Sequence, residues 1–321
     1  QFPEKAVLTP EIAALIGSKK LNRPVKLVLH REQMFTNVGF RPYTIQKMGL
    51  GATKAGKLTG LTHEAVAMTS SYEDFMEGTV NMSRFIYDCA NVSTRYRIVP
   101  LDTCTPIWMR GPGEATGAFA LESAIDEMAH AAKQDPFAFR KKLTKDNSRF
   151  QRVLDLVYEK SNWGTPLPAN WGRGIAIAQS FGSIVAEVAE VEVGIDGKVK
   201  VHRVVCAVDP GFAIHPNGFI AQMESGIIYG LAAAMTGEIT IENGAVAQSN
   251  FHNYPVTRMN EAPKIETHII NSGNPPGGGG EPSTPVIAPA VTNAIFDATG
   301  IRIRQLPISK NDLRASIQQT T

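Results

Sequence analysis

Hydrophobic and polar positions along the first hundred residues follow patterns that predict one helix and several strands. Thr9-Pro10 is a typical helix start, because a hydroxyl residue precedes proline in the first turn. The apolar pattern that follows stops at Asn22. The strands that we expect next are Val25–Leu29, the two arms of a hairpin at Tyr43–Leu50 and Leu58–Met68, and Ala90–Val99.

The middle of the chain has a helical period. Leu121, Ile125, Met128 and Ala132 are spaced by four, three and four residues, which places them on one face of a helix. The further helices that we expect here start at Asp135-Pro136 and span Arg152–Lys160. Residues 141–149 are mostly polar and charged, so we expect a domain junction there, with domains at 1–145 and 146–321.

The second half mixes strands with long apolar helices. The elements that we expect are a hairpin of Ile184–Val193 and Lys198–Val208, a helix at Asn217–Ala234, a hairpin at Glu238–Ala247, a strand at Ile265–Ile270, a helix at Val286–Thr299 and a closing strand at Ile301–Leu306. Helices follow hairpins rather than alternating with single strands. The order therefore favours an α+β fold over a doubly wound parallel sheet.

Composition narrows the function classes. A chain of 321 residues with 43% hydrophobic and 19% charged residues is long enough for two domains with buried cores. The net charge of +2 comes without any basic tract, so we expect no nucleic-acid partner. Gly218–Met235 comes nearest to a membrane span, but Gln222 and Glu224 interrupt it, so no span is expected. The three cysteines lack CxxC spacing, which excludes a cysteine-bound zinc or iron–sulfur site within this sequence.

A glycine run that ends on a carboxylate is the strongest chemical signal. Gly277–Gly280 precede Glu281, and prolines flank the loop before the next helix begins. Glycines let backbone amides approach a ligand closely, and a helix start adds unpaired N–H groups. Glu281 is therefore placed to act as a base on a bound group. The alternative is a surface turn with a solvated glutamate.

A second glycine-containing loop precedes the helix of the middle region. Gly111, Gly113 and Gly117 have the spacing GxGxxxG, one residue longer than the dinucleotide fingerprint. No strand that ends in an acid follows, as a nicotinamide-binding unit would require. The amides beside Arg110 suit an anionic pyrophosphate or pterin group, while a tight turn with a solvated arginine remains the alternative.

Other sites are weaker. Gln222 lies among small and apolar residues of a helix, where either backbone groups or a cofactor would satisfy its amide. The seven histidines show no HxxxH or HxH spacing, so no metal-ligand set is expected. Neither a GxSxG nucleophile motif nor a GxxxxGK[ST] phosphate loop is present.

Taken together, several separated motifs resemble the molybdenum-cofactor subunits of the xanthine dehydrogenase/aldehyde oxidase family, and among them the β-subunit of isoquinoline 1-oxidoreductase. The stretches that carry the resemblance are Trp108–Glu114, Ala120–Glu127, Asp135–Arg140, Val208–Gly211, His215–Asn217, Gln222–Gly226, Gly277–Glu281, Pro289–Ile295 and Ala298–Gly300. The resemblance covers nearly the whole chain. It implies two α/β-sandwich-type domains of mixed sheets with packed helices, each a part of a molybdopterin-binding domain.

The resemblance also assigns roles to residues. Glu281 matches the active-site base, which deprotonates the hydroxyl group on molybdenum so that its oxygen attacks an electron-poor carbon. The cofactor-binding residues that it implies are Arg110, Gly111, Pro112, Gly113, Gln222, Gly278, Gly279 and Gly280. Gly279 stands where the family more often has Val or Ile.

The implied cofactor is molybdenum–molybdopterin, as a cytosine dinucleotide, with iron–sulfur clusters on a partner subunit. The implied substrate is an N-heteroaromatic ring or an aldehyde, in a pocket formed partly by Met68–Met76. The family's Gly-Gly-x-Phe-Gly and Gly-Gln-Gly segments are absent, so we expect a C-terminal part of a larger subunit whose upstream part is a partner. A non-catalytic fragment or pseudoenzyme that packs against partner subunits without metal is the alternative.

Overall fold

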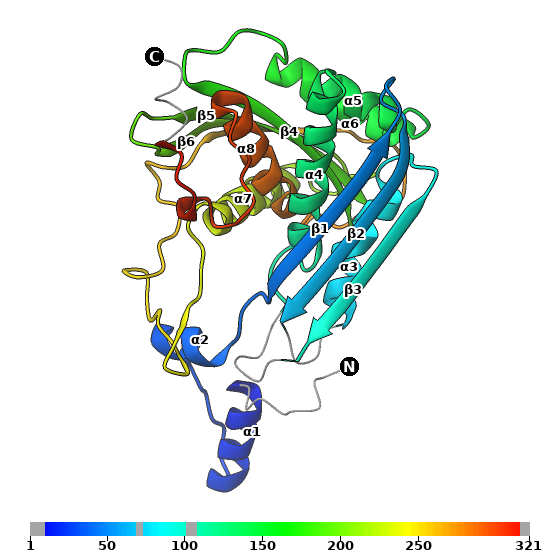
Figure 1. Cartoon of the computed structure of the whole chain (residues 1–321). Helices are drawn as coiled ribbons and strands as arrows, with labels where there is room; N and C mark the ends of the chain where they lie inside the picture. The colour runs from blue at the N-terminus through cyan, green and yellow to red at the C-terminus, as the bar shows by residue number, and fades with distance from the viewer. Residues whose placement is uncertain (1–9, 69–72, 101–107, 315–321) are drawn as a thin grey trace.

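Two mixed β-sheets with helices packed on them form the body of the protein (Figure 1). The computed structural model describes residues 10–68, 73–100 and 108–314. The first sheet contains one antiparallel and one parallel pair of strands, and the second contains two antiparallel pairs and one parallel pair. The predicted α+β fold with two mixed sheets is confirmed.

The first sheet contains the predicted hairpin and the strand predicted at Ala90–Val99. Its strands are β1 (Tyr43–Ala52), β2 (Leu58–Met68) and β3 (Val92–Val99), in that order. β1 and β2 are antiparallel, with Tyr43 opposite Met68, whereas β3 runs parallel to β2 with Val92 opposite Leu61. The parallel connection passes through α3 (Glu73–Phe85), as a crossover between parallel strands requires.

The second sheet is the more deeply buried of the two. Its strands are β4 (Trp171–Ser180), β5 (Ser183–Val193), β6 (Val199–Asp209) and β9 (Lys264–Ile269). β5 is buried along nearly its whole length because α8 (Thr284–Thr299) packs against it and α6 (Ser148–Ser161) contacts it as well. A strand covered on both faces shows a continuous apolar run rather than alternation.

The remaining helices complete the body, apart from one at the N-terminal end. They are α1 (Pro10–Leu21), α2 (Arg31–Asn37), α4 (Glu114–Ala131), α5 (Pro136–Leu143), α7 (Pro216–Met235) and a 3₁₀-helix at Ile308–Lys310, and two two-residue strands form a small hairpin, β7 (Ile241–Glu242) with β8 (Ala245–Val246). α4 and α7 both pack against α8. α1 extends away from the body in Figure 1 and buries none of its residues.

One hydrophobic cluster runs through both halves of the chain. It includes Leu121 and Ile125 of α4, Val188 of β5 and Val291 of α8. The two sheets lie on either side of residue 146 in the sequence, but their core is shared. The domain division at 145/146 stays a prediction.

Glycines bring α8 close to the edge strand β4. A Cβ atom added at Gly174 would lie 2.2 Å from the Ala294 nitrogen and 2.3 Å from the Ala290 oxygen of α8. Only a residue without a side chain permits this approach. The sequence analysis missed β4, because these glycines and the preceding proline-rich loop interrupt its apolar pattern.

Two predicted strands are wrong. Val25–Leu29 forms no strand and lies in the connection between α1 and α2, where Val28 is 69% exposed. Ile301–Leu306 also forms no strand. Its alternation arises because Ile303 is buried while Arg302 and Arg304 form ion pairs with acids of α4.

Candidate functional site

The candidate site lies where three segments that are distant in sequence meet. These are the loop of residues 109–113 before α4, the loop of residues 277–283 before α8, and the middle of α7. The packing of α7 and α4 on α8 brings them together. Both loops lead into helix N-termini, which carry unpaired amides.

Arg110 connects the three segments. Its Nε donates to the Gly280 carbonyl oxygen at 2.5 Å, and one terminal nitrogen donates to the Ser225 hydroxyl at 2.9 Å. The other donates to Gln222, at 2.9 Å to the carbonyl and 3.0 Å to the side-chain oxygen. The guanidinium group is thus engaged with protein groups, whereas the sequence analysis placed it beside an anion.

Glu281 points to the Arg110 loop. Its Oε2 accepts a hydrogen bond from the Gly111 amide at 2.6 Å, in the range of charge-assisted bonds. The side chain is partly buried, and Oε1 has no hydrogen-bond partner among the described residues. One oxygen is therefore anchored, while the other is open to a ligand.

The glycine loop is fixed at its start and open at its end. Gly277 donates to the Pro210 carbonyl and Gly278 to the Phe181 carbonyl, both at 2.7 Å. Within the described part of the chain, the amides of Gly279 and Gly280 have no partner, and Gly280 is exposed. These two amides adjoin Glu281 and are available to an anionic ligand.

The wall behind the loop comes from α7. A Cβ atom added at Gly279 would lie 2.6 Å from the nearest ring carbon of Phe219. The aromatic ring therefore occupies the space into which a side chain at 279 would point. A Cβ atom at Gly280 would meet nothing within 4 Å, so the open side of the loop lies one residue nearer Glu281.

A partly buried acid follows the Arg110 loop. Glu114 begins α4, and its Oε2 is buried without a hydrogen-bond partner among the described residues. Burial raises the pKa of Glu114, and the nearby Glu281 carboxylate adds to that rise. Arg41 has the opposite effect on Glu114.

Arg41 is a site residue that the sequence analysis missed. Its terminal nitrogens donate to the Gly111 carbonyl at 2.7 Å and to the Arg110 carbonyl at 2.8 Å. It lies about 70 residues earlier in the chain, between α2 and β1. No local motif marks it, so no sequence signal could have found it.

The structure brings most of the predicted site residues into one place. Arg110, Gly111, Gln222, Gly280 and Glu281 form a connected set of hydrogen bonds. The other predicted residues adjoin that set, Pro112 and Gly113 in the turn before α4, and Gly278 and Gly279 in the loop before Gly280. Their roles in binding or catalysis stay predictions.

Two expectations have a different outcome. Gln222 is exposed rather than buried, and Arg110 binds its side-chain oxygen, while its amide nitrogen has no hydrogen-bond partner among the described residues. The predicted pocket segment Met68–Met76 lies partly outside the described residues, at 69–72.

Among the residues described, no group of three or more His, Cys, Asp or Glu side chains could hold a metal ion. The same part of the chain has no helix of the length and apolarity that a bilayer crossing needs.

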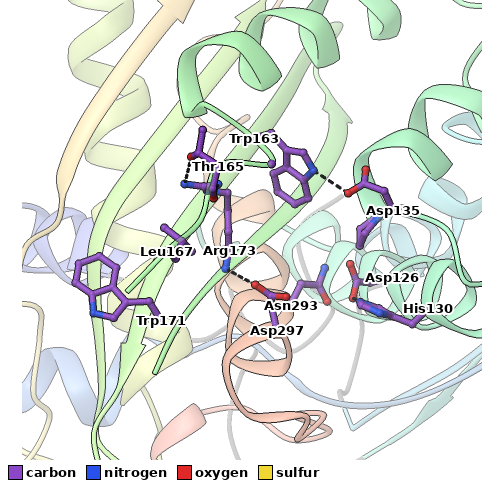
Figure 2. A pocket seen from close by; sticks show the side chains of 12 residues that line it. Asp126, His130, Asp135, Trp163, Thr165, Leu167, Trp171, Arg173, Asn293 and Asp297 are labelled. Carbon is purple, nitrogen blue, oxygen red and sulfur yellow. Dashed lines mark hydrogen bonds and ion pairs between the residues drawn. The ribbon is translucent and has the colours of Figure 1, made fainter. Parts of the chain in front are cut away.

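A polar cavity of about 340 Å³ lies at the far end of α8 (Figure 2). Asp297, at that end, is about 20 Å along the helix from Thr284 at 1.5 Å per residue. The polar groups bind one another: Trp163 donates to Asp135 and the Arg173 amide donates to Asp297, each at 2.9 Å. This cavity is separate from the Glu281 site, and nothing in it indicates a ligand.

A larger cavity of about 980 Å³ borders the site, and its lining includes Phe40, the residue before Arg41. One face of α7, together with α2 and parts of residues 239–265, forms its mostly apolar walls. It reaches the site at Met109 and at Ser225, the serine that Arg110 binds. Its only charged lining residues within the described chain are Arg31 and Glu224.

Comparison with known proteins gives the family context. Sequence models of molybdopterin cofactor-binding domains match residues 2–143 and 115–263. The chain is 35% identical to the isoquinoline 1-oxidoreductase β-subunit of Brevundimonas diminuta, over 65% of this chain and 27% of that subunit. It is 28% identical to a membrane-bound aldehyde dehydrogenase of Gluconacetobacter polyoxogenes, whose name specifies pyrroloquinoline quinone, over 96% of this chain and 44% of that protein.

The fold is shared with a solved structure. Quinoline 2-oxidoreductase from Pseudomonas putida matches 96% of this chain and 66% of its own with a TM-score of 0.82 at 14% identity. That identity supports likeness of fold alone. The chain spans less than half the length of the two relatives above. The expected resemblance is confirmed: the chain belongs to the molybdopterin cofactor-binding domains of the xanthine dehydrogenase/aldehyde oxidoreductase family and corresponds to part of their larger subunits.

Proposed function

We propose that this chain forms part of the molybdopterin-binding subunit of a molybdenum hydroxylase, with Glu281 as the base. The observation that carries the proposal is the half-bonded state of Glu281. The Gly111 amide fixes Oε2, while Oε1 stays free beside two unpartnered amides. A general base needs this combination of fixed geometry and an available lone pair.

The residues of the site fit an anionic cofactor such as molybdopterin. Gly279 and Gly280 present amides without partners, and no Cβ atom obstructs the open side of Gly280. Gln222 is exposed, with its oxygen held by Arg110, so its amide nitrogen is available to a pterin ring. These three residues would hold the cofactor.

Within such a site the protein's own groups do the following. The bound cofactor would supply an oxygen atom that derives from water and would accept the two electrons that the substrate loses. Glu281 would remove the proton of the attacking hydroxyl group at Oε1, while the Gly111 amide keeps its carboxylate oriented. Arg110 holds the two loops and α7 at fixed separation, which preserves that orientation.

The relatives support a proposal for the substrate and the partners. Isoquinoline 1-oxidoreductase, nicotinate dehydrogenase and aldehyde oxidoreductase subunits are among the proteins similar to this chain. We therefore propose an N-heteroaromatic or aldehyde substrate. We further propose the cytosine dinucleotide form of the cofactor, an iron–sulfur partner subunit that receives the electrons, and the remaining part of the same subunit as the other partner.

Replacing Glu281 in the complete enzyme complex tests the proposal. Glu281→Gln keeps the hydrogen-bond acceptor toward Gly111 but removes the basic oxygen. Turnover should fall about 10²–10⁴-fold, the usual contribution of a general base, while molybdenum content persists. Glu242→Gln, at an exposed acid of the β7–β8 hairpin, should leave turnover unchanged. Normal turnover of Glu281→Gln would refute the assignment.

The alternative is a non-catalytic part that binds partner subunits without metal. Molybdenum analysis of the purified complex distinguishes the two, because stoichiometric metal contradicts the alternative. The name of the aldehyde dehydrogenase relative adds a second question, since it specifies a quinone. Extraction of the cofactor answers it: a pterin supports our proposal, and pyrroloquinoline quinone overturns it.

A further inference from the structure

Arg41 and the candidate base Glu281 form hydrogen bonds with opposite ends of the same peptide unit. One of its terminal nitrogens donates to the Arg110 carbonyl oxygen at 2.8 Å. The nitrogen of that same peptide unit belongs to Gly111, and it donates to Glu281 Oε2 at 2.6 Å. The positive group and the carboxylate thus bind the two ends of one planar amide.

Because Arg41 binds the carbonyl oxygen and Glu281 binds the amide N–H, the peptide unit transmits the effect of the Arg41 charge to Glu281. A cation on the carbonyl oxygen draws electron density from the amide, which makes its N–H a stronger donor. Hydrogen bonds in such a chain polarise one another and strengthen by about 10–30% per bond. The bond that orients Glu281 therefore depends on a group that does not touch Glu281.

Arg41 also fixes the loop in place. Its second terminal nitrogen donates to the Gly111 carbonyl at 2.7 Å, so the planar fork spans two successive carbonyls. Its backbone amide donates to the Met109 sulfur at 3.3 Å. A lysine could reach one of these carbonyls but could not reproduce the fork.

The surroundings of Arg41 keep its guanidinium group on the loop. Burial lowers the pKa of Arg41, while Tyr229, Glu114 and Glu281 oppose that effect. A partly buried cation that loses water must find acceptors in the protein. Here it finds the two carbonyls of the Arg110 loop.

We propose that Arg41 is the positioning residue of Glu281 and acts through the Arg110–Gly111 peptide unit. The proposal rests on the proposed function only in that it takes Glu281 as the base. Arg41 contacts neither the free oxygen Oε1 nor the open amides of Gly279 and Gly280. Its effect on catalysis is therefore indirect.

Selective isotope labelling makes the test specific. The sequence contains only two Arg–Gly pairs, Arg110-Gly111 and Arg173-Gly174. Protein with ¹³C-carbonyl arginine and ¹⁵N glycine therefore gives two filtered amide signals, and the Gly174 signal serves as an internal control. The measurement is made on the full chain and needs no activity.

Arg41→Met removes the charge and keeps much of the apolar volume. The Gly111 amide proton should move upfield and exchange with solvent about 10–100-fold faster, as the loss of a charge-assisted hydrogen bond implies. The Gly174 signal should not move. Arg41→Lys should give an intermediate shift, and it replaces Arg41→Met in the test if that variant does not fold. An unchanged Gly111 signal in a folded variant overturns the proposal.

Arg203→Met is the matched control. Arg203 also donates to a backbone carbonyl, that of Lys160, but lies on the second sheet. The Arg203→Met change should leave the Gly111 amide signal in place. A shift of that signal would show that the effect of Arg41 is not specific.

Kinetics of the loaded complex complete the test. Arg41→Met should lower kcat and leave KM unchanged, because Arg41 acts on the base rather than on substrate binding. If Glu281→Gln stays active while the Gly111 signal responds to Arg41, the proposed function fails and the positioning contact stands. If Glu281→Gln loses activity while the Gly111 signal does not respond to Arg41→Met, only the positioning role is refuted.

Discussion

Two carboxylates near α4 show how differently the same chemical group is bound in two places of one structure. Glu122 is fully buried, and Tyr87, Arg140 and the Ile177 amide donate to it at 2.5, 2.9 and 2.9 Å. Glu281 accepts one hydrogen bond and keeps a free oxygen. A carboxylate with both oxygens hydrogen-bonded is held in one orientation, whereas Glu281 keeps one oxygen without a protein partner in the described chain.

The largest expected effect comes from breaking the Glu122 network. Arg140→Met leaves a buried carboxylate without its cation, and the free energy of unfolding should fall by about 3–5 kcal/mol. Urea denaturation measures the change. Adding Glu122→Gln should recover part of the loss, because no unpaired charge then remains.

An exposed ion pair on the same helix provides the control for that experiment. Arg304→Met, which removes the partner of Glu127, should cost less than about 1 kcal/mol. If Arg304→Met and Arg140→Met cost the same, burial does not explain the stability of the Glu122 network.

A second prediction concerns the wall behind Glu281. Gly279→Val should lower the free energy of unfolding by about 1–3 kcal/mol, because the new side chain overlaps the Phe219 ring. Phe219→Ala combined with Gly279→Val should be more stable than the sum of the single changes predicts. Gly280→Ala is the control, since its Cβ meets no atom within 4 Å, and it should shift stability by under about 0.5 kcal/mol. Strictly additive effects would mean that the ring and residue 279 are independent.

The smallest expected effect tests a third acid, Glu187 of β5. It is fully buried, and neither of its carboxylate oxygens has a partner among the described residues. Burial raises the pKa of Glu187 well above 4.5, so the folded protein keeps a proton that the unfolded chain releases. The contribution of protonated Glu187 to the free energy of unfolding is therefore fully present below about pH 4.5. It is lost as the pH rises through the folded-state pKa.

Glu187→Gln removes that pH dependence. The variant should be more stable than the wild-type protein by about 1 kcal/mol at pH 8, with little difference near pH 4, as an acid that prefers its neutral form implies. Urea denaturation at several pH values measures the difference. Glu242→Gln, at an exposed acid, should follow the wild-type curve. A constant difference across this range would contradict the assignment of the effect to Glu187.

Local sequence patterns were sufficient for many of the elements but not for the contacts between them. Periodicity placed the β1–β2 hairpin, α4, α7 and α8, because each buries one face or both. The same rule wrongly predicted a strand at Ile301–Leu306, where the alternation comes from ion pairs with α4. It also missed β4, where glycine replaces apolar residues to admit a helix.

The candidate site was predictable in part for a related reason. Glycine runs and a helix start identified both loops from the sequence alone. The hydrogen bond from Gly111 to Glu281 spans 170 positions, and the one from Arg41 to Gly111 spans 70. Composition and spacing carry no signal for such pairs, so Arg41 and Phe219 emerge only from the folded chain.

The bonds that Arg110 forms have a consequence for biosynthesis. Its acceptor at Gly280 enters the polypeptide 170 residues later. A growing chain on the ribosome therefore carries the Arg110 loop for a long interval during which the candidate site is incomplete. A cofactor that binds there, as we propose, would have to be delivered after translation has passed Gly280, which would make insertion a late event in maturation rather than a nucleus for folding.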